Sequence, residues 1–206
     1  MLVEEYGRVW HLTRGLADKG HAVEAVCCDY HGESGVDAKR YEGEAGGWIN
    51  WISYRINPYL PTSWWSYARH LLFVARAFKP DAILAFSDAY QLILGAWLAR
   101  KLDVPLIADF YDNYESFAAS SIPGIRYLLG GAVRSASTVT CVSAPLRDYV
   151  ALRYRRSGAT MVIENGVDSG FLPGVSQADA RRCLGLPPDS QIVGTAGALD
   201  AGHGIE

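Results

Sequence analysis

Residues 81–110, DAILAFSDAYQLILGAWLARKLDVPLIADF, decide the fold class of this chain. Two short apolar runs, 81–87 and 104–110, flank a segment at 89–102 that is apolar nearly all round and ends in a pair of cations, which suit the carboxyl end of a helix dipole. Strands that are apolar on both faces and separated by a helix are typical of a parallel sheet covered on both sides. The stretch therefore predicts a strand–helix–strand unit of an α/β domain.

The same alternation of apolar runs and helical patterns continues on both sides of this unit. Further strands are predicted at 21–28, 48–56, 137–143, 159–164 and 191–197. Further helices are predicted at 6–19, 63–78, 123–135, 144–155 and 176–185. The polar, Gly-rich stretch at 29–47 is predicted to be a loop. Together the pattern indicates a Rossmann-like, doubly wound parallel sheet.

Glycines and prolines cluster at residues 165–190 and interrupt this pattern. Such a cluster is typical of a linker and predicts a domain boundary. We therefore expect a Rossmann-like domain at 1–164, an interdomain hinge at 165–190, and the first strand and loop of a second domain at 191–206.

The composition is that of a globular protein and restricts the possible partners. Of the 206 residues, 50% are hydrophobic and 20% are charged, and the formal net charge is −3. Without a basic excess to neutralise phosphates, a nucleic-acid partner is not expected. No run approaches the roughly 18 apolar residues that span a bilayer, and no signal-peptide pattern opens the chain. We expect a protein that is cytoplasmic, either free or peripheral at the inner membrane surface.

The cysteines are not spaced as zinc ligands are, and we interpret them as free thiols in a reducing compartment. They are Cys27, Cys28, Cys141 and Cys183. No metal site is expected.

Short motifs follow one another in a fixed order along the chain. They are DKGHAV (18–23), KPDAILAF (79–86), VPLIADFYD (104–112), SASTVTCVSAPLRDYV (135–150), VIENGVDSGFLP (162–173) and LGLPPD (184–189). This ordered series resembles the N-terminal, acceptor-side domain of the family 4-type GT-B glycosyltransferases, and the resemblance spans almost the whole chain.

Members of that family transfer a sugar from a nucleotide-sugar donor to a hydroxyl acceptor, often a growing glycan or a glycolipid, and the resemblance implies the same substrates here. It implies no metal or other cofactor, because positive side chains and helix N-termini of the second domain stabilise the diphosphate leaving group. The family's motifs for the ribose and the diphosphate have no counterpart, and the chain begins inside the loop that follows the family's mid-sheet first strand. We therefore expect a domain that is truncated at both ends and inactive by itself.

Two alternatives stay open. The chain could be a non-catalytic acceptor-binding subunit that needs a separate donor-binding chain. It could also be a Rossmann-like small-molecule binding protein, although such a protein would not need the NGVD hinge. No G-x-G-x-x-G follows a strand, which argues against a dinucleotide dehydrogenase.

The loop after the strand at 104–110 holds the candidate catalytic residues, because open α/β sheets bind ligands at the carboxyl ends of their strands. Asp109, Asp112 and Glu115 are predicted to act there, since a carboxylate can orient a sugar hydroxyl or take its proton. The alternative is that these carboxylates are solvated and cap a turn. Tyr111 is expected to contact substrate, because it stands where the family commonly has a histidine.

Two further pairs of residues are candidates for substrate binding. Gly7 and Arg8 resemble the end of the family's N-terminal loop, whose backbone approaches the donor phosphates; the alternative is an ordinary helix start. Ser87 and Asp88 follow a predicted buried strand, where they would contact the acceptor or cap the next helix.

A further prediction concerns the hinge between the two domains. Asn165 and Gly166 suit a tight turn between domains because both tolerate positive φ, and Asp168 is expected to brace the crossover.

The helix predicted at 63–78 carries Trp64 and Trp65 together with Arg69 and Arg76. An aromatic stripe at helical spacing usually packs in a core, whereas aromatics and arginines on an exposed face suit a membrane surface. Both interpretations stay open.

Overall fold

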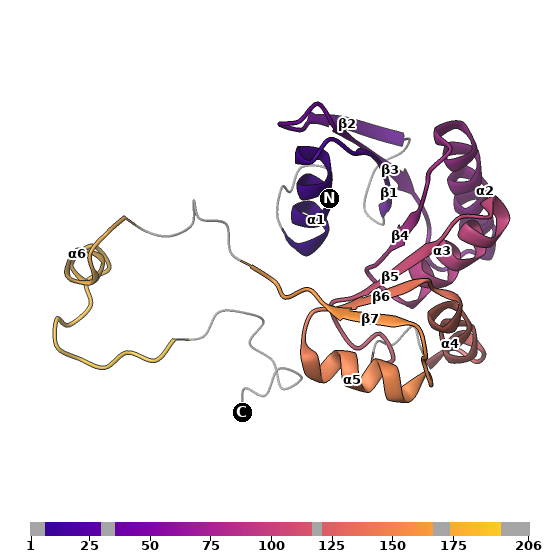
Figure 1. The fold of residues 1–206 in the computed structure, drawn as a ribbon. Coiled ribbons are helices and arrows are strands. Elements are labelled where there is room, and N and C mark those ends of the chain that lie inside the picture. The colour runs from indigo at the N-terminus through magenta and orange to yellow at the C-terminus, as the bar shows by residue number, and fades with distance from the viewer. Residues whose placement is uncertain (1–6, 30–35, 117–120, 167–173, 195–206) are drawn as a thin grey trace. The chain divides into compact units, whose positions relative to one another are not determined.

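The computed structural model describes residues 7–29, 36–116, 121–166 and 174–194 (Figure 1). They belong to two compact units, of which the first ends at Asn165 and the second begins at Gly166.

The first unit alternates helices and strands along its length. In chain order it contains α1 (Gly7–Asp18), β1 (Ala22–Asp29), β2 (Val36–Glu42), β3 (Trp48–Arg55), α2 (Pro61–Phe78), β4 (Ile83–Ala85), α3 (Ala89–Leu102), β5 (Leu106–Phe110), α4 (Ile125–Ser135), β6 (Thr138–Cys141), α5 (Ala144–Arg153) and β7 (Ala159–Val162). The predicted α/β fold class is confirmed, and each helix and strand predicted for this part of the chain is present.

The second unit contains α6 (Gln177–Cys183), which is the helix predicted at 176–185. Ser176 caps it by accepting a hydrogen bond from the backbone N–H of Asp179. Of the strand predicted at 191–197, the described residues 191–194 have neither helical nor strand structure.

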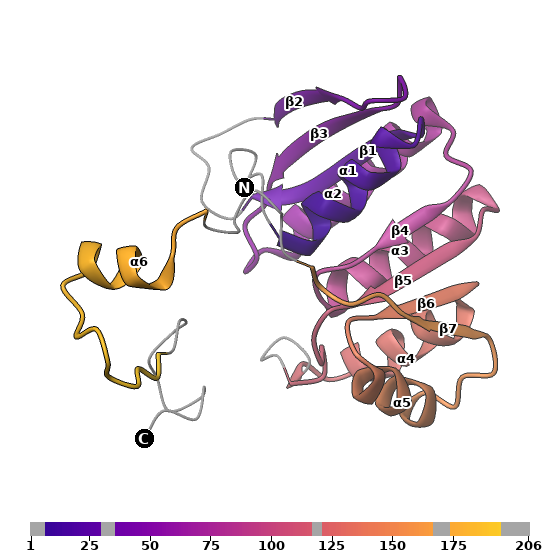
Figure 2. The ribbon, with the colours of Figure 1, turned by 60° about the vertical axis from the view of Figure 1, so that its left-hand side comes forward.

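The strands of the first unit form two sheets (Figures 1 and 2). One is wholly parallel, with the order β4-β5-β6-β7, and the other has the order β1-β3-β2. In the latter, β1 and β3 are parallel whereas β2 runs antiparallel to β3. Two details thus differ from the prediction, namely the antiparallel strand and the division of the sheet.

Strand β2 lies within residues 29–47, which the sequence predicts to be a loop. It occupies the edge of its sheet and carries Lys39, Arg40 and Glu42. Charged side chains are common on edge strands, where they prevent pairing with other chains. The polarity that suggested a loop is therefore a property of the strand's position at the edge.

The division of the sheet falls between β1 and β4, and β4 is the next strand beyond β1 in both views (Figures 1 and 2). Side chains connect the two sheets at this point. The amide of Gln91 in α3 donates to the sulfur of Cys28 in β1 (3.1 Å), and the hydroxyl of Tyr67 in α2 lies 3.4 Å from both the carbonyl of Val26 and Oε1 of Gln91.

Helices cover both faces of the three-stranded sheet. Val23 and Ala25 of β1 pack toward α1, in a cluster with Trp10. Val26 and Cys28 pack toward α2. Because alternate residues of a strand point to opposite faces, α1 and α2 lie on opposite sides of the sheet, which is the doubly wound arrangement.

The largest core lies where α3, α4 and α5 pack on the four-stranded sheet. Its fully buried apolar side chains include Leu92, Phe110, Leu129, Val133, Val139 and Val150. Each such side chain contributes about 1.5–3 kcal/mol by its burial, so this sheet is a rigid support for the loops at its edge.

Gly95 of α3 allows close contact between that helix and β4. A Cβ added at this position would lie 2.5 Å from the Cβ of Ala85. We predict that Gly95→Ala lowers the free energy of unfolding by about 1–3 kcal/mol, because the helix has to move away from the sheet. Urea unfolding followed by circular dichroism measures the change.

Gly131 of α4 provides the matched control, since it is also helical but a Cβ there would meet no described atom within 4 Å outside its own helix backbone. Gly131→Ala should raise the free energy of unfolding by about 0.5–1 kcal/mol through helix propensity alone. Equal effects of the two substitutions would contradict the close packing of α3 on β4.

Candidate active site

A buried ion pair joins helix α1 to strand β5. Asp109 near the end of β5 is fully buried (0% exposed). Arg8, in the first turn of α1, donates from Nε and from Nη2 to the two carboxylate oxygens of Asp109, each at 2.8 Å. This bidentate geometry is the strongest form of a carboxylate–guanidinium contact. The hydrogen bonds to Asp109 raise the pKa of Arg8 above its ordinary value, so the guanidinium stays charged.

Thr140 of β6 completes the surroundings of the Asp109 carboxylate. The two residues are partners in the parallel register of β5 and β6, so their side chains lie on the same face of the sheet. The Thr140 hydroxyl donates to Oδ1 of Asp109. Both carboxylate oxygens are thus occupied by protein donors.

Arg8 also holds the segment that follows β7. Its Nη1 donates to the carbonyl oxygen of Ile163 (2.6 Å) and to Oδ1 of Asn165 (3.1 Å). The start of α1 therefore lies at the carboxyl ends of β5 and β7. One side chain connects the first helix, the centre of the sheet and the last residues of the unit.

The hydroxyl of Tyr114 organises the loops after β4 and β5. It donates to the carbonyl of Asp109 (3.0 Å) and accepts from the backbone N–H groups of Ser87 (3.2 Å) and Tyr111 (3.5 Å). Burial raises the pKa of Tyr114, so its hydroxyl keeps the proton that it donates. The Tyr111 hydroxyl in turn donates to the carbonyl of Ser87 (3.1 Å), which joins the two loops a second time.

The remaining predicted carboxylates have different surroundings. Asp112 is exposed, and its Oδ1 accepts from the N–H of Asn113 (2.6 Å). Glu115 is directed to α5, where it accepts from the Tyr154 hydroxyl (2.9 Å) and from Nε of Arg153 (3.0 Å). Among the three predicted catalytic carboxylates, Asp112 is the one most open to a ligand.

Asp88 caps α3 by accepting a hydrogen bond from the N–H of Gln91 (2.9 Å). Burial raises the pKa of Asp88. Two roles were predicted for Asp88, acceptor contact and helix capping, and the structure shows the helix cap.

The structure brings most of the predicted residues to one edge of the sheet. Those connected by the hydrogen bonds above are Arg8, Ser87, Asp109, Tyr111 and Asn165. Gly7 and Gly166 are exposed neighbours of Arg8 and Asn165, Glu115 belongs to the contact with α5, and Asp168 lies outside the described residues.

Thr140 and Tyr114 are not among the residues predicted from the sequence. Thr140 could have been found from the parallel register, because a polar residue in the strand beside Asp109 is expected to share its face. Tyr114 carries no such signal, since the loop that positions it is irregular.

The described residues contain no group of three or more His, Cys, Asp or Glu side chains that could hold a metal ion. Nor is any helix in this part of the chain long and apolar enough to cross a membrane.

A model of the glycosyl transferase 4-like domain matches residues 7–166, a range that contains the whole network around Arg8 and Asp109. The chain belongs to this glycosyltransferase family. The resemblance seen in the ordered motifs is thereby confirmed, and the domain is that of a transferase of the GT-B type.

Known proteins similar to this glycosyl transferase 4-like domain agree with that membership. The chain is 26% identical over 102 residues to an alpha-monoglucosyldiacylglycerol synthase from Streptococcus pneumoniae, a match that covers 46% of the chain and 23% of that protein. Its fold is similar to the sucrose-phosphate synthase from Thermosynechococcus elongatus, with a TM-score of 0.61, 16% identity, and coverage of 90% of this chain and 49% of that one.

A further similar structure is Anabaena Alr3699/HepE in complex with UDP and glucose, with a TM-score of 0.50, 17% identity, and coverage of 80% of this chain and 50% of that one. The chain thus spans half or less of the length of these proteins.

The ion pair gives a stability prediction for this domain. Arg8→Met should lower the free energy of unfolding by about 3–5 kcal/mol, because Asp109 is left as a buried charge without its partner. Chemical unfolding measures the loss, and the double variant Arg8→Met/Asp109→Asn should lose less than the sum of the single changes.

Arg14→Met is the matched control on the same helix. Arg14 forms a partly exposed i,i+4 pair with Asp18, and such a pair contributes about 0.5 kcal/mol or less. Similar losses for Arg8→Met and Arg14→Met would show that the buried network does not stabilise the domain.

Proposed function

We propose that this chain forms the acceptor-side half of a glycosyltransferase that moves a sugar from a nucleotide-sugar to a hydroxyl group of a glycan or glycolipid. The observation that carries the proposal is the network of Arg8 and Asp109, which fixes the loops at the carboxyl edge of the parallel sheet. Open α/β sheets bind their ligands at this edge. The similarity to a glycolipid synthase and to a sucrose-phosphate synthase supports the same substrate classes.

The donor diphosphate would lie near the start of α1. The first N–H groups of a helix have no partner within the helix and attract anions. Gly7 is exposed, and among the described residues outside its own helix backbone no atom lies within 4 Å of the position that a Cβ would take, so these residues leave a phosphate room to approach the backbone. The Arg8 side chain acts differently, since its donors are used on Asp109, Ile163 and Asn165.

The acceptor hydroxyl would be held by Asp112. An exposed carboxylate at the end of a loop can accept a hydrogen bond from a sugar hydroxyl and take its proton as the bond to the donor sugar forms. Asp109 has both oxygens occupied and suits a positioning role. Glu115, held by α5, suits the same kind of role. Tyr111, Ser87 and Asp88 form the neighbouring surface.

The diphosphate leaving group would be stabilised by cationic side chains of a second, donor-binding domain, without a metal. Because the chain spans half or less of its relatives, we propose that this domain belongs either to the same protein or to a separate chain. Family membership favours this transferase over an unrelated small-molecule binding protein. A cytoplasmic location stays a prediction.

The first experiment separates binding from turnover. The purified chain is incubated with radiolabelled UDP-glucose and a glucosyldiacylglycerol in detergent micelles, and both transfer and binding are measured. We expect no transfer by the chain alone, because the donor-binding half is not among these residues. Turnover under these conditions would overturn the expected inactivity.

Acceptor binding is then measured by saturation-transfer NMR on the sugar protons. Asp112→Ala should weaken it about tenfold, since a hydrogen bond to a charged group contributes about 1.5–3 kcal/mol. Asp148→Ala is the matched control, because Asp148 is likewise an exposed carboxylate, on α5. Equal effects of both variants, or no binding of donor or acceptor, would contradict the proposal.

A further inference from the structure

One side of helix α2 is exposed along its whole length and combines aromatic with cationic side chains. Trp65, Arg69, Phe73 and Arg76 follow one another at intervals of three or four residues, so they share one side of the helix. Trp65 is 67% and Phe73 is 73% exposed, and both arginines are exposed. We call these four residues the α2 face.

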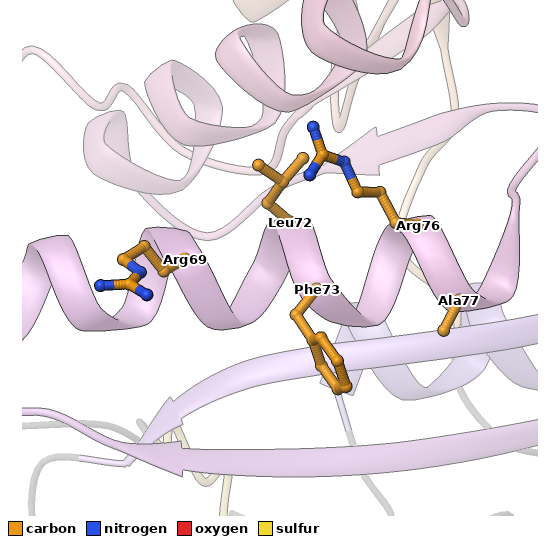
Figure 3. Close-up of a pocket in the computed structure, with 5 residues that line it drawn as sticks. All are labelled: Arg69, Leu72, Phe73, Arg76 and Ala77. Atoms are coloured by element: carbon orange, nitrogen blue, oxygen red, sulfur yellow. The ribbon is translucent and has the colours of Figure 1, made fainter.

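A surface hollow of about 400 Å³ lies on the α2 face and is lined by Arg69, Leu72, Phe73, Arg76 and Ala77 (Figure 3). Its lining combines two guanidinium groups with aliphatic and aromatic carbon. Such a lining suits a ligand that has both an anionic group and an apolar part.

The other side of α2 is occupied by the protein itself. Trp64 donates from Nε1 to the carbonyl of Pro58 (3.1 Å), and its ring lies 4.9 Å from that of Tyr90. His70 stacks on Tyr54, and burial lowers the pKa of its imidazole, so it adds little positive charge at neutral pH. The two interpretations of the tryptophan helix thus apply to different residues: Trp64 packs inward, and Trp65 is on the surface.

The stretch of sequence that contains α2 is positive, whereas the rest of the chain is negative. Residues 45–80 contain Arg55, Arg69, Arg76 and Lys79 but no Asp or Glu. The rest of the sequence has 15 basic and 22 acidic residues, so a charge of +4 here stands against −7 elsewhere. Among the ion pairs of the described residues, none involves Arg69 or Arg76.

We propose that the α2 face docks on an anionic lipid surface. The two arginines would bind the phosphates of the head groups, while Trp65 and Phe73 enter the boundary between head groups and acyl chains. A helix that carries basic and aromatic side chains on its exposed side can lie in the plane of such a surface. Each cation close to an anionic leaflet contributes attraction that falls with added salt.

The orientation of α2 links this surface to the candidate active site. Helix α2 follows the carboxyl end of β3, and its first turns contact the first turn of α3 through the rings of Trp64 and Tyr90. Tyr59 and Leu60, which directly precede α2, are 90% and 51% exposed. Docking would hold the carboxyl edge of the sheet near the lipid, where a glycolipid acceptor is anchored. The delivery of a glycolipid acceptor rests on the proposed function, whereas the docking itself does not.

Sedimentation with lipid vesicles tests the docking, and it needs neither donor nor acceptor. The complete chain is mixed with vesicles of phosphatidylcholine alone, or of phosphatidylcholine and phosphatidylglycerol in equal parts. We expect binding to the anionic vesicles only. The double variant Arg69→Gln/Arg76→Gln should lower the partition coefficient about 30-fold, which corresponds to about 1 kcal/mol for each arginine.

Arg100→Gln/Lys101→Gln removes the same charge from exposed positions on α3 and should lower the partition coefficient far less. Phe73→Ser should weaken binding, whereas Tyr127→Ser, at a position 79% exposed on α4, should not. Unfolding curves verify that each variant is folded. Three outcomes would overturn the proposal. The first is equal binding to both kinds of vesicle, and the second is an equal loss of binding for the two charge variants. The third is a dimer that Phe73→Ser dissociates and that lipid does not affect.

Discussion

The buried guanidinium of Arg8 holds the carboxyl edge of this domain together. A carboxylate that is fully buried, as Asp109 is, can remain ionised only with a charged or strongly hydrogen-bonding partner beside it. Arg8 provides that partner and still has a donor nitrogen for Ile163 and Asn165. The flat, forked shape of the side chain makes this possible, because its donors point in several fixed directions at once. A lysine has a single nitrogen and could not replace these contacts together.

Much of the fold could be predicted from the sequence because its core strands are short, apolar and separated by amphipathic or apolar helices. The unit β4-α3-β5 is the clearest example. Strand β2 escaped prediction because its charged residues belong to an edge, and composition alone does not distinguish a polar edge strand from a loop. Pairing with β3 at long range decides its structure, and a pattern within one segment contains no information on such pairing.

The candidate site, like the fold, could be predicted from the sequence only in part. The sequence indicates which loops meet at the carboxyl edge, since topology alone brings them there. It does not indicate how Asp109, Asp112 and Glu115 differ, because all three are carboxylates within one short segment. Their environments separate them: Asp109 is enclosed by Arg8 and Thr140, Glu115 is held by α5, and Asp112 is exposed. Tertiary contacts that come from distant segments create that distinction.

The division of the sheet between β1 and β4 has a consequence for how the domain opens. Within each sheet, strands are joined by ladders of backbone hydrogen bonds, but in the described residues the two sheets are joined through side chains such as Tyr67 and Gln91. Separating them therefore breaks no ladder. The three-stranded and four-stranded sheets are natural candidates for distinct cooperative units of local unfolding, with the boundary at this seam. Arg8 reaches from α1, on the smaller sheet, to Asp109 in the larger one, so the same ion pair that shapes the edge also couples the stabilities of the two units.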